Sequence, residues 1–127
     1  MSQKIVGRLD IHIGLCDGRH TIRTNENEEM DYFVFDGFVE LPCATDVHEK
    51  VCRDFIRNHV VQYDWGTQAQ PLRFNLYITG LTPLLTSFLK CWVEQQERLE
   101  MWAIDLVLWH YDTMDAEYVP QKWVVMR

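Results

Sequence analysis

The stretch RFNLYITGLTPLLTSFLKCWVEQQERLEMWAIDLVLWH, residues 73–110, decides the expected fold because its hydrophobic period changes twice. Apolar residues at alternate positions predict a strand over 73–79 with one buried face. Apolar residues then recur at the spacing of one helical face, which predicts a helix over 83–97. The next segment is apolar on both faces, as in a central parallel strand, and it spans 103–110. We therefore expect one βαβ unit with a right-handed crossover.

The N-terminal part of the chain predicts a β-hairpin. Residues 4–15 alternate between apolar and polar side chains over most of their length, and Asp17-Gly18 follows them directly. Asp-Gly between alternating segments is a strong turn signal, so we expect the return strand over 19–24. A further short strand is expected over 32–35.

The remaining expected elements are an earlier helix near 46–63 and a C-terminal strand over 118–126. Asp46 begins a capping-box pattern. Four apolar residues then fall on one helical face, which we expect to be buried: Val47, Val51, Phe55 and Ile56. The last strand is expected to run antiparallel at the sheet edge, where Pro120 is tolerated. The predicted fold is thus α/β, with a mixed sheet in a single domain over residues 1–127.

Composition limits the classes of partner. The chain has 127 residues, a hydrophobic fraction of 47% and a formal net charge of −7. An acidic protein is a poor candidate for binding duplex nucleic acid, which requires the neutralisation of many phosphates. The sequence contains no apolar segment of membrane-spanning length and no signal-peptide pattern at its N-terminus. We therefore expect a cytoplasmic protein that binds neither membrane nor duplex nucleic acid.

The four cysteines have no spacing typical of metal ligands. Most of them have apolar neighbours, where a thiol behaves as a small hydrophobic group, so we expect reduced core residues. No metal site and no cofactor are predicted. The cysteines are Cys16, Cys43, Cys52 and Cys91.

The clearest candidate binding residues are Thr79, Gly80, Leu81 and Thr82, where the first strand of the βαβ unit leads into the helix. Ligands of open α/β sheets bind at this end of the strands. Free N–H groups and the helix dipole favour an anion there, and a glycine allows close approach to the backbone. The same residues also fit a simple turn and helix cap, with Pro83 as the first helical residue.

Two further groups of residues could complete a ligand site. Arg19, His20 and Arg23 lie in the predicted return strand, and an arginine could clamp a phosphate there. His110 and Tyr111 end the second parallel strand, so they reach the same sheet edge and could contact a ribose or stack on a base. A solvated strand face and the start of a hairpin remain open as alternatives for these two groups.

Two segments carry a resemblance to a known family. FNLYITGLTPLLTSFLK and LVLWHYDTMDAEYVPQ, with a weaker match at Asp17-Gly18-Arg19-His20 and 31–36, resemble the phage Thoeris anti-defence proteins of the first described type. The sequence departs from that family in its tryptophan-containing loop, 62–71. More remotely, the same residues resemble CRISPR-associated Rossmann-like domains and ring nucleases.

The first resemblance implies an oligomeric sponge that binds cyclic ADP-ribose-type immune signals, and small cyclic oligonucleotides, without cleaving them. It implies a homo-oligomer in the host cytoplasm with the ligand near a subunit interface, and a protein that is not an enzyme. The many aromatic residues also favour subunit contacts. The alternative is a ring nuclease or sensor domain acting on cyclic oligoadenylate, since orientation alone can support such cleavage without a recognisable triad.

Overall fold

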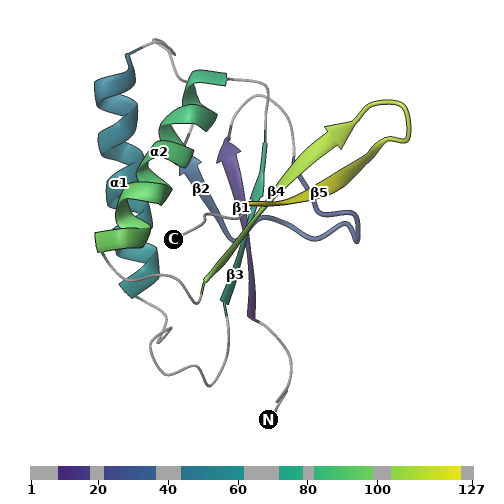
Figure 1. Cartoon of the computed structure of the whole chain (residues 1–127). Coiled ribbons are helices and arrows are strands. Elements are labelled where there is room, and N and C mark those ends of the chain that lie inside the picture. The colour runs from purple at the N-terminus through teal and green to yellow at the C-terminus, as the bar shows by residue number, and fades with distance from the viewer. Residues whose placement is uncertain are drawn as a thin grey trace.

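The computed structural model describes residues 9–17, 22–36, 44–61, 72–78, 82–98 and 104–123. Within these ranges the chain forms five strands and two helices (Figure 1). In chain order they are β1 (Leu9–Cys16), β2 (Tyr32–Phe35), α1 (Thr45–Val61), β3 (Leu72–Tyr77), α2 (Thr82–Arg98), β4 (Asp105–Asp112) and β5 (Glu117–Trp123). The loop 62–71 lies outside the described residues.

The five strands form one mixed sheet in the order β2-β1-β3-β4-β5. β1 runs parallel to β2 and β3, β3 runs parallel to β4, and β5 is antiparallel to β4 at the edge. The α/β fold, the βαβ unit of β3, α2 and β4, and the antiparallel edge strand are therefore confirmed.

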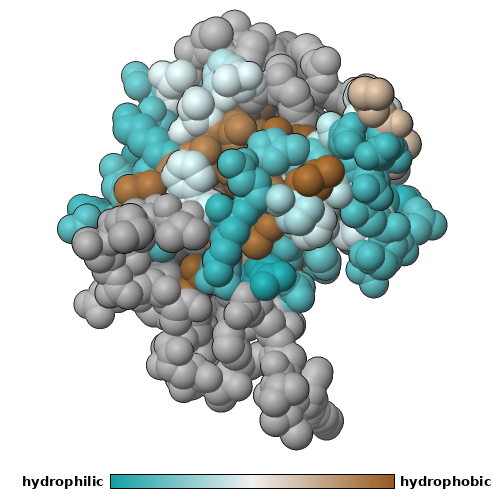
Figure 2. Space-filling model, turned by 45° about the vertical axis from the view of Figure 1, so that its right-hand side comes forward, coloured by the Kyte–Doolittle hydropathy of each residue, from teal (hydrophilic) through white to brown (hydrophobic). Residues whose placement is uncertain are grey.

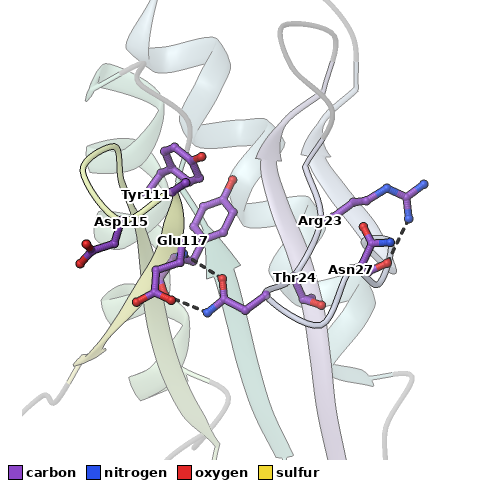
Figure 3. Close-up of a pocket in the computed structure, with 9 residues that line it drawn as sticks. Arg23, Thr24, Asn27, Tyr111, Asp115 and Glu117 are labelled. Atoms are coloured by element: carbon purple, nitrogen blue, oxygen red, sulfur yellow. Dashed lines mark hydrogen bonds between the residues drawn. The ribbon is translucent and has the colours of Figure 1, made fainter.

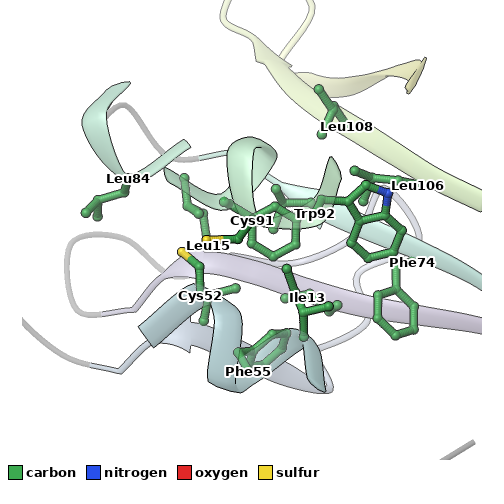
Figure 4. Packing of buried hydrophobic residues seen from close by; sticks show 14 of the residues in the cluster. Ile13, Leu15, Cys52, Phe55, Phe74, Leu84, Cys91, Trp92, Leu106 and Leu108 are labelled. Atoms are coloured by element: carbon green, nitrogen blue, oxygen red, sulfur yellow. The ribbon is translucent and has the colours of Figure 1, made fainter. Parts of the chain in front are cut away.

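Both helices cover the same face of the sheet (Figure 1). The connections from β2 to β3 and from β3 to β4 step across the sheet in the same direction, so right-handed crossovers place α1 and α2 on one side. The helices lie side by side. Arg53 Nε of α1 pairs with Glu94 of α2, and Lys90 Nζ of α2 pairs with Glu49 of α1. Apolar side chains of the two layers form the core (Figure 4), including Ile13, Leu15, Phe74, Leu76, Phe88 and Trp92.

The predicted N-terminal β-hairpin is wrong. β2 occupies one edge of β1 at residues 13–16, and β3 occupies the other at 9–14, so no edge is left for an antiparallel return. Residues 19–21 of the expected return lie outside the described part of the chain. Arg23 forms an isolated bridge with Glu29 instead of a ladder with β1. The connection to a parallel neighbour must cross a face of the sheet, and residues 22–30, which we name the strap, form part of this crossover.

The buried face of α1 also differs from the expected one. Val47 is 61% exposed and Val51 is 36% exposed, whereas His48 and Cys52 are buried beside Phe55 and Ile56. The helix begins at Thr45, before the expected cap, and the Ala44 carbonyl accepts hydrogen bonds from the amides of residues 47 and 48. His48 packs edge-on against the ring of Phe35, with centroids 5.4 Å apart. The contact with the Phe35 ring therefore stabilises the polar His48 in the core. The hydrophobicity of His48 alone does not predict this position.

The thiols of the described cysteines lie in the core, as predicted. Cys16, Cys52 and Cys91 are buried, and Cys43 lies outside the described residues. Burial, with smaller contributions from Cys91 and Glu49, raises the pKa of the Cys52 thiol to about 12. Burial also raises the pKa of Cys91. These thiols are therefore protonated at neutral pH and are poor nucleophiles.

We predict that the buried thiols resist modification in the native protein. A Cys43→Ser variant mixed with a thiol-reactive disulfide reagent at pH 8 should release almost no signal until denaturant is added, after which three thiols should react. The measurement is the absorbance of the released thiolate. Rapid reaction of a thiol in the folded variant would contradict the buried, protonated state.

The face of the sheet opposite the helices is closely packed at Gly14. A Cβ atom built on Gly14 would lie 2.5 Å from Cε1 of Phe33, which is closer than carbon atoms can approach. The side chain of Ile22 in the strap lies 3.4 Å from the same point. The absence of a side chain at residue 14 therefore lets the Phe33 ring and the strap lie against β1.

We predict that Gly14→Ala lowers the free energy of unfolding by about 1–3 kcal/mol, because the added methyl group displaces the Phe33 ring. The effect should vanish or change sign in a Phe33→Ala background, since alanine is otherwise favoured over glycine in a strand. Urea unfolding of the four proteins in this double-mutant cycle checks the prediction. An equal cost of Gly14→Ala in both backgrounds would show that Phe33 is not the cause.

Candidate functional site

A cavity of about 300 Å³ lies between the strap and the hairpin formed by β4 and β5 (Figure 3). The strap provides one wall and the hairpin provides the other. Hydrophilic side chains gather on the surface around the hairpin (Figure 2). The cavity is lined by Arg23, Thr24, Asn25, Asn27, Tyr111, Asp115, Ala116, Glu117 and Tyr118.

Short-range hydrogen bonds shape the strap wall. The buried Thr24 accepts a bond from the Glu28 amide at its Oγ1, and its own amide donates to the Glu28 carbonyl. Asn27 adopts a left-handed backbone with φ of 65°, a conformation that asparagine tolerates better than most residues. These features fold residues 24–28 into a tight turn that faces the hairpin.

The hairpin wall is shaped in a similar way. The Asp112 side chain accepts a bond of 2.9 Å from the Met114 amide, and Ala116 is left-handed with φ of 55°. The turn reverses the chain so that Tyr111 on β4 lies opposite Tyr118 on β5. Both rings therefore stand on the same face of the sheet, the face that the strap crosses.

A series of aromatic rings forms the floor beside the cavity. The rings of Tyr111 and Tyr118 meet edge-on at 5.1 Å, and Tyr118 meets Tyr77 edge-on at 5.0 Å. Tyr77 in turn stacks on Trp109 at 5.5 Å. Tyr111 is 51% exposed, so one aromatic surface remains open to a ligand. Burial raises the pKa of both Tyr77 and Tyr118, which keeps their hydroxyl groups protonated at neutral pH.

Polar side chains on the same face hold the inner rings in place. The Tyr77 hydroxyl lies 3.2 Å from Nδ1 of His12, and Trp109 Nε1 donates to Asn75 Oδ1 at 2.9 Å. The Asn75 amide nitrogen donates to Asp10 Oδ1 at 3.1 Å. Buried polar groups that are paired in this way have defined orientations, so the floor of the site is rigid.

The charges of the cavity lining favour a polar ligand over a highly charged anion. The lining contains one guanidinium and two carboxylates. The Arg23 guanidinium donates to the Asn27 carbonyl at 3.2 Å and lies 3.4 Å from a Glu29 oxygen. In Figure 3 it points away from Tyr111. A phosphate could engage Arg23 only after this arginine leaves Glu29.

The structure brings together two of the predicted site residues, Arg23 and Tyr111, in one cavity. His110 points to the opposite face of the sheet because adjacent strand residues alternate, and its Nε2 lies 2.8 Å from Gln121 Oε1. Thr82 is exposed at the start of α2, whose first turn contains no acidic residue. Five predicted residues lie outside the described part of the chain: Arg19, His20, Thr79, Gly80 and Leu81.

The cavity lining includes three residues that the sequence did not predict: Asn25, Asn27 and Tyr118. Residues 25–30 are polar and acidic over most of their length, which is typical of an exposed turn. The two asparagines near each other were a signal, since asparagine favours tight turns and can bond to main-chain groups. Nothing local indicates that this turn meets β5, which lies far away in the sequence.

Within the described ranges, no three histidine, cysteine or acidic residues gather into a group that could hold a metal ion. Neither of the described helices is both long and apolar enough to cross a membrane. The chain matches no protein-family model, no curated protein sequence and no solved structure.

Proposed function

We propose that this protein binds a small cyclic nucleotide in the cavity between the strap and the hairpin and holds it without cleaving it. One observation carries the proposal: Arg23 and Tyr111, which sequence reasoning selected separately as ligand residues, line the same cavity. A nucleotide needs an aromatic surface for its base and polar groups for its sugar and phosphate. The cavity offers both.

Each part of such a ligand has a suitable partner in the cavity lining. The exposed ring of Tyr111 can stack on a base, with the edge of Tyr118 beside it. Asp115 and Glu117 can accept hydrogen bonds from ribose hydroxyls, a common role for carboxylates in nucleotide sites. Arg23 can exchange Glu29 for a phosphate at little cost, because a solvent-exposed ion pair contributes little stability.

The topology of the sheet also favours ligand binding in this region. β1 and β3 are neighbours in the sheet. The connection after β1 leads to β2 on one side, and the connection after β3 leads to β4 on the other side. Open α/β sheets bind ligands at such a point, beyond the carboxyl ends of the strands. We propose that part of the ligand extends toward this edge, where Thr82 begins α2 and Thr79–Leu81 precede it in the sequence.

The resemblance to anti-defence sponges adds the biological context. We propose that the bound molecule is a cyclic ADP-ribose-type or cyclic oligonucleotide immune signal, and that its sequestration counters bacterial anti-phage defence in the host cytoplasm. Assembly into a homo-oligomer, with the ligand near a subunit interface, belongs to the same proposal. The ring-nuclease alternative differs from it only in the fate of the ligand.

Adjacent residues on opposite faces provide a matched test of the site. Tyr111→Ala should weaken binding of cyclic ADP-ribose or 3′,3′-cyclic di-AMP at least about tenfold, because stacking on a base contributes about 1–3 kcal/mol. His110→Ala should leave the affinity nearly unchanged, since its side chain faces away from the cavity. Isothermal titration calorimetry with both probes measures the two effects. The reverse pattern would place the ligand on the helix-covered face instead.

The fate of the ligand separates a sponge from an enzyme. We predict that a long incubation of the protein with excess ligand, followed by heating, returns the input compound unchanged. Liquid chromatography of the released material provides the measurement. Steady conversion to a linear product, lost in Arg23→Ala or Tyr111→Ala, would show that the protein is a ring nuclease.

A further inference from the structure

We infer that Asn25 is the positioning residue of the cavity: its side chain latches the strap to β5, and opening of this latch lets the ligand leave. The inference rests on the proposed function, because it describes what holds the two walls of the same cavity against the ligand. Asn25 lines the cavity but was not among the ligand residues predicted from the sequence.

The latch consists of two hydrogen bonds to the main chain of one residue. Asn25 Nδ2 donates to the Tyr118 carbonyl at 3.0 Å, and the Tyr118 amide donates to Asn25 Oδ1 at 2.9 Å. The N–H and C=O of Tyr118 therefore face away from β4, as both groups do at alternate residues of an antiparallel strand. A side-chain amide thus replaces the main chain of a neighbouring strand on the outer edge of β5.

Among the described residues, the hydrogen bonding between strap and hairpin depends on this one residue. In the described part of the chain, both hydrogen bonds between the strap and the β4–β5 hairpin come from Asn25. The next residue of β5 whose main chain faces outward is Pro120, which has no N–H to donate. Beyond the strap, Asp31 is held separately: its amide bonds to the His12 carbonyl, and its carboxylate accepts the His12 amide. The strap can therefore lift at Asn25 while Asp31 keeps it attached.

Opening at Asn25 would change the cavity directly. Asn25 and Thr24 belong to one wall, and Tyr118 belongs to the other, so the latch sets the distance between the walls. Tyr118 also lies between the rings of Tyr111 and Tyr77. A few solvent-exposed hydrogen bonds open much more often than the whole protein unfolds, so the two walls can separate and release a small molecule that they hold.

Two variants test the latch, and a third serves as the matched control. Asn25→Ala removes both hydrogen bonds. Asn25→Asp keeps the shape and one acceptor oxygen but, when ionised at neutral pH, cannot donate to the Tyr118 carbonyl. Asn58→Ala removes an exposed asparagine of α1, away from the cavity.

Hydrogen exchange and ligand kinetics provide the readouts. In Asn25→Ala, the Tyr118 amide should exchange about tenfold faster, and bound cyclic ADP-ribose or 3′,3′-cyclic di-AMP should dissociate about tenfold faster, the effect of losing one or two net hydrogen bonds. Asn25→Asp should change both rates in the same direction. The association rate should stay close to that of the wild type. The free energy of unfolding should fall by about 1.4 kcal/mol, the equivalent of the tenfold change at Tyr118, because the opened and the unfolded states both lack the two hydrogen bonds. Asn58→Ala should alter none of these quantities.

The outcomes separate this inference from the proposed function. Faster exchange at Tyr118 with unchanged ligand dissociation would overturn the latch and leave the proposed function intact. Faster dissociation accompanied by a loss of unfolding free energy several times larger than the change in opening at Tyr118 would also overturn it, because Asn25 would then support the fold beyond the strap. Failure of the wild type to bind either probe would overturn the proposed function and the latch together.

Discussion

The parallel pairing of β1 with both β2 and β3 is the constraint on which the rest of the structure depends. A parallel neighbour can be reached only by a connection that crosses a face of the sheet. The connections to β3 and β4 lead in one direction and place both helices on one face. The connection from β1 to β2 leads the other way, so the strap crosses the opposite face and reaches the hairpin. The cavity is therefore a consequence of strand order.

The face under the strap is polar and aromatic, whereas the face under the helices is aliphatic and aromatic. Along β1 and β3, alternation places Ile11 and Ile13 toward the helices and His12 toward the strap, paired with Tyr77. A face covered by a single strap retains access to water near its edges, so hydrogen-bonding side chains are tolerated there. Paired polar groups give that face defined ring orientations, which a binding site needs.

The proposed ligand chemistry follows from this contrast. A protein with net charge −7 and a cavity containing two carboxylates is poorly suited to attract a polyanion over a distance. Stacking on Tyr111 and hydrogen bonds to ribose hydroxyls act only at contact, so they do not depend on the overall charge. Recognition of this kind favours selective capture of a small nucleotide over general binding of nucleic acids.

The sequence by itself determined the βαβ unit, the antiparallel edge strand and the burial of the described cysteines. These features depend on local period and composition, which change clearly at the boundaries of α2. Strand pairing is not local: Asp17-Gly18 is a turn signal in any context, but β2 and β3 compete for the edges of β1 and exclude a return strand. The inward position of His48 needs the ring of Phe35. In the same way, only the tertiary structure brings Asn25 to Tyr118, because their contact depends on the path of the strap across the sheet.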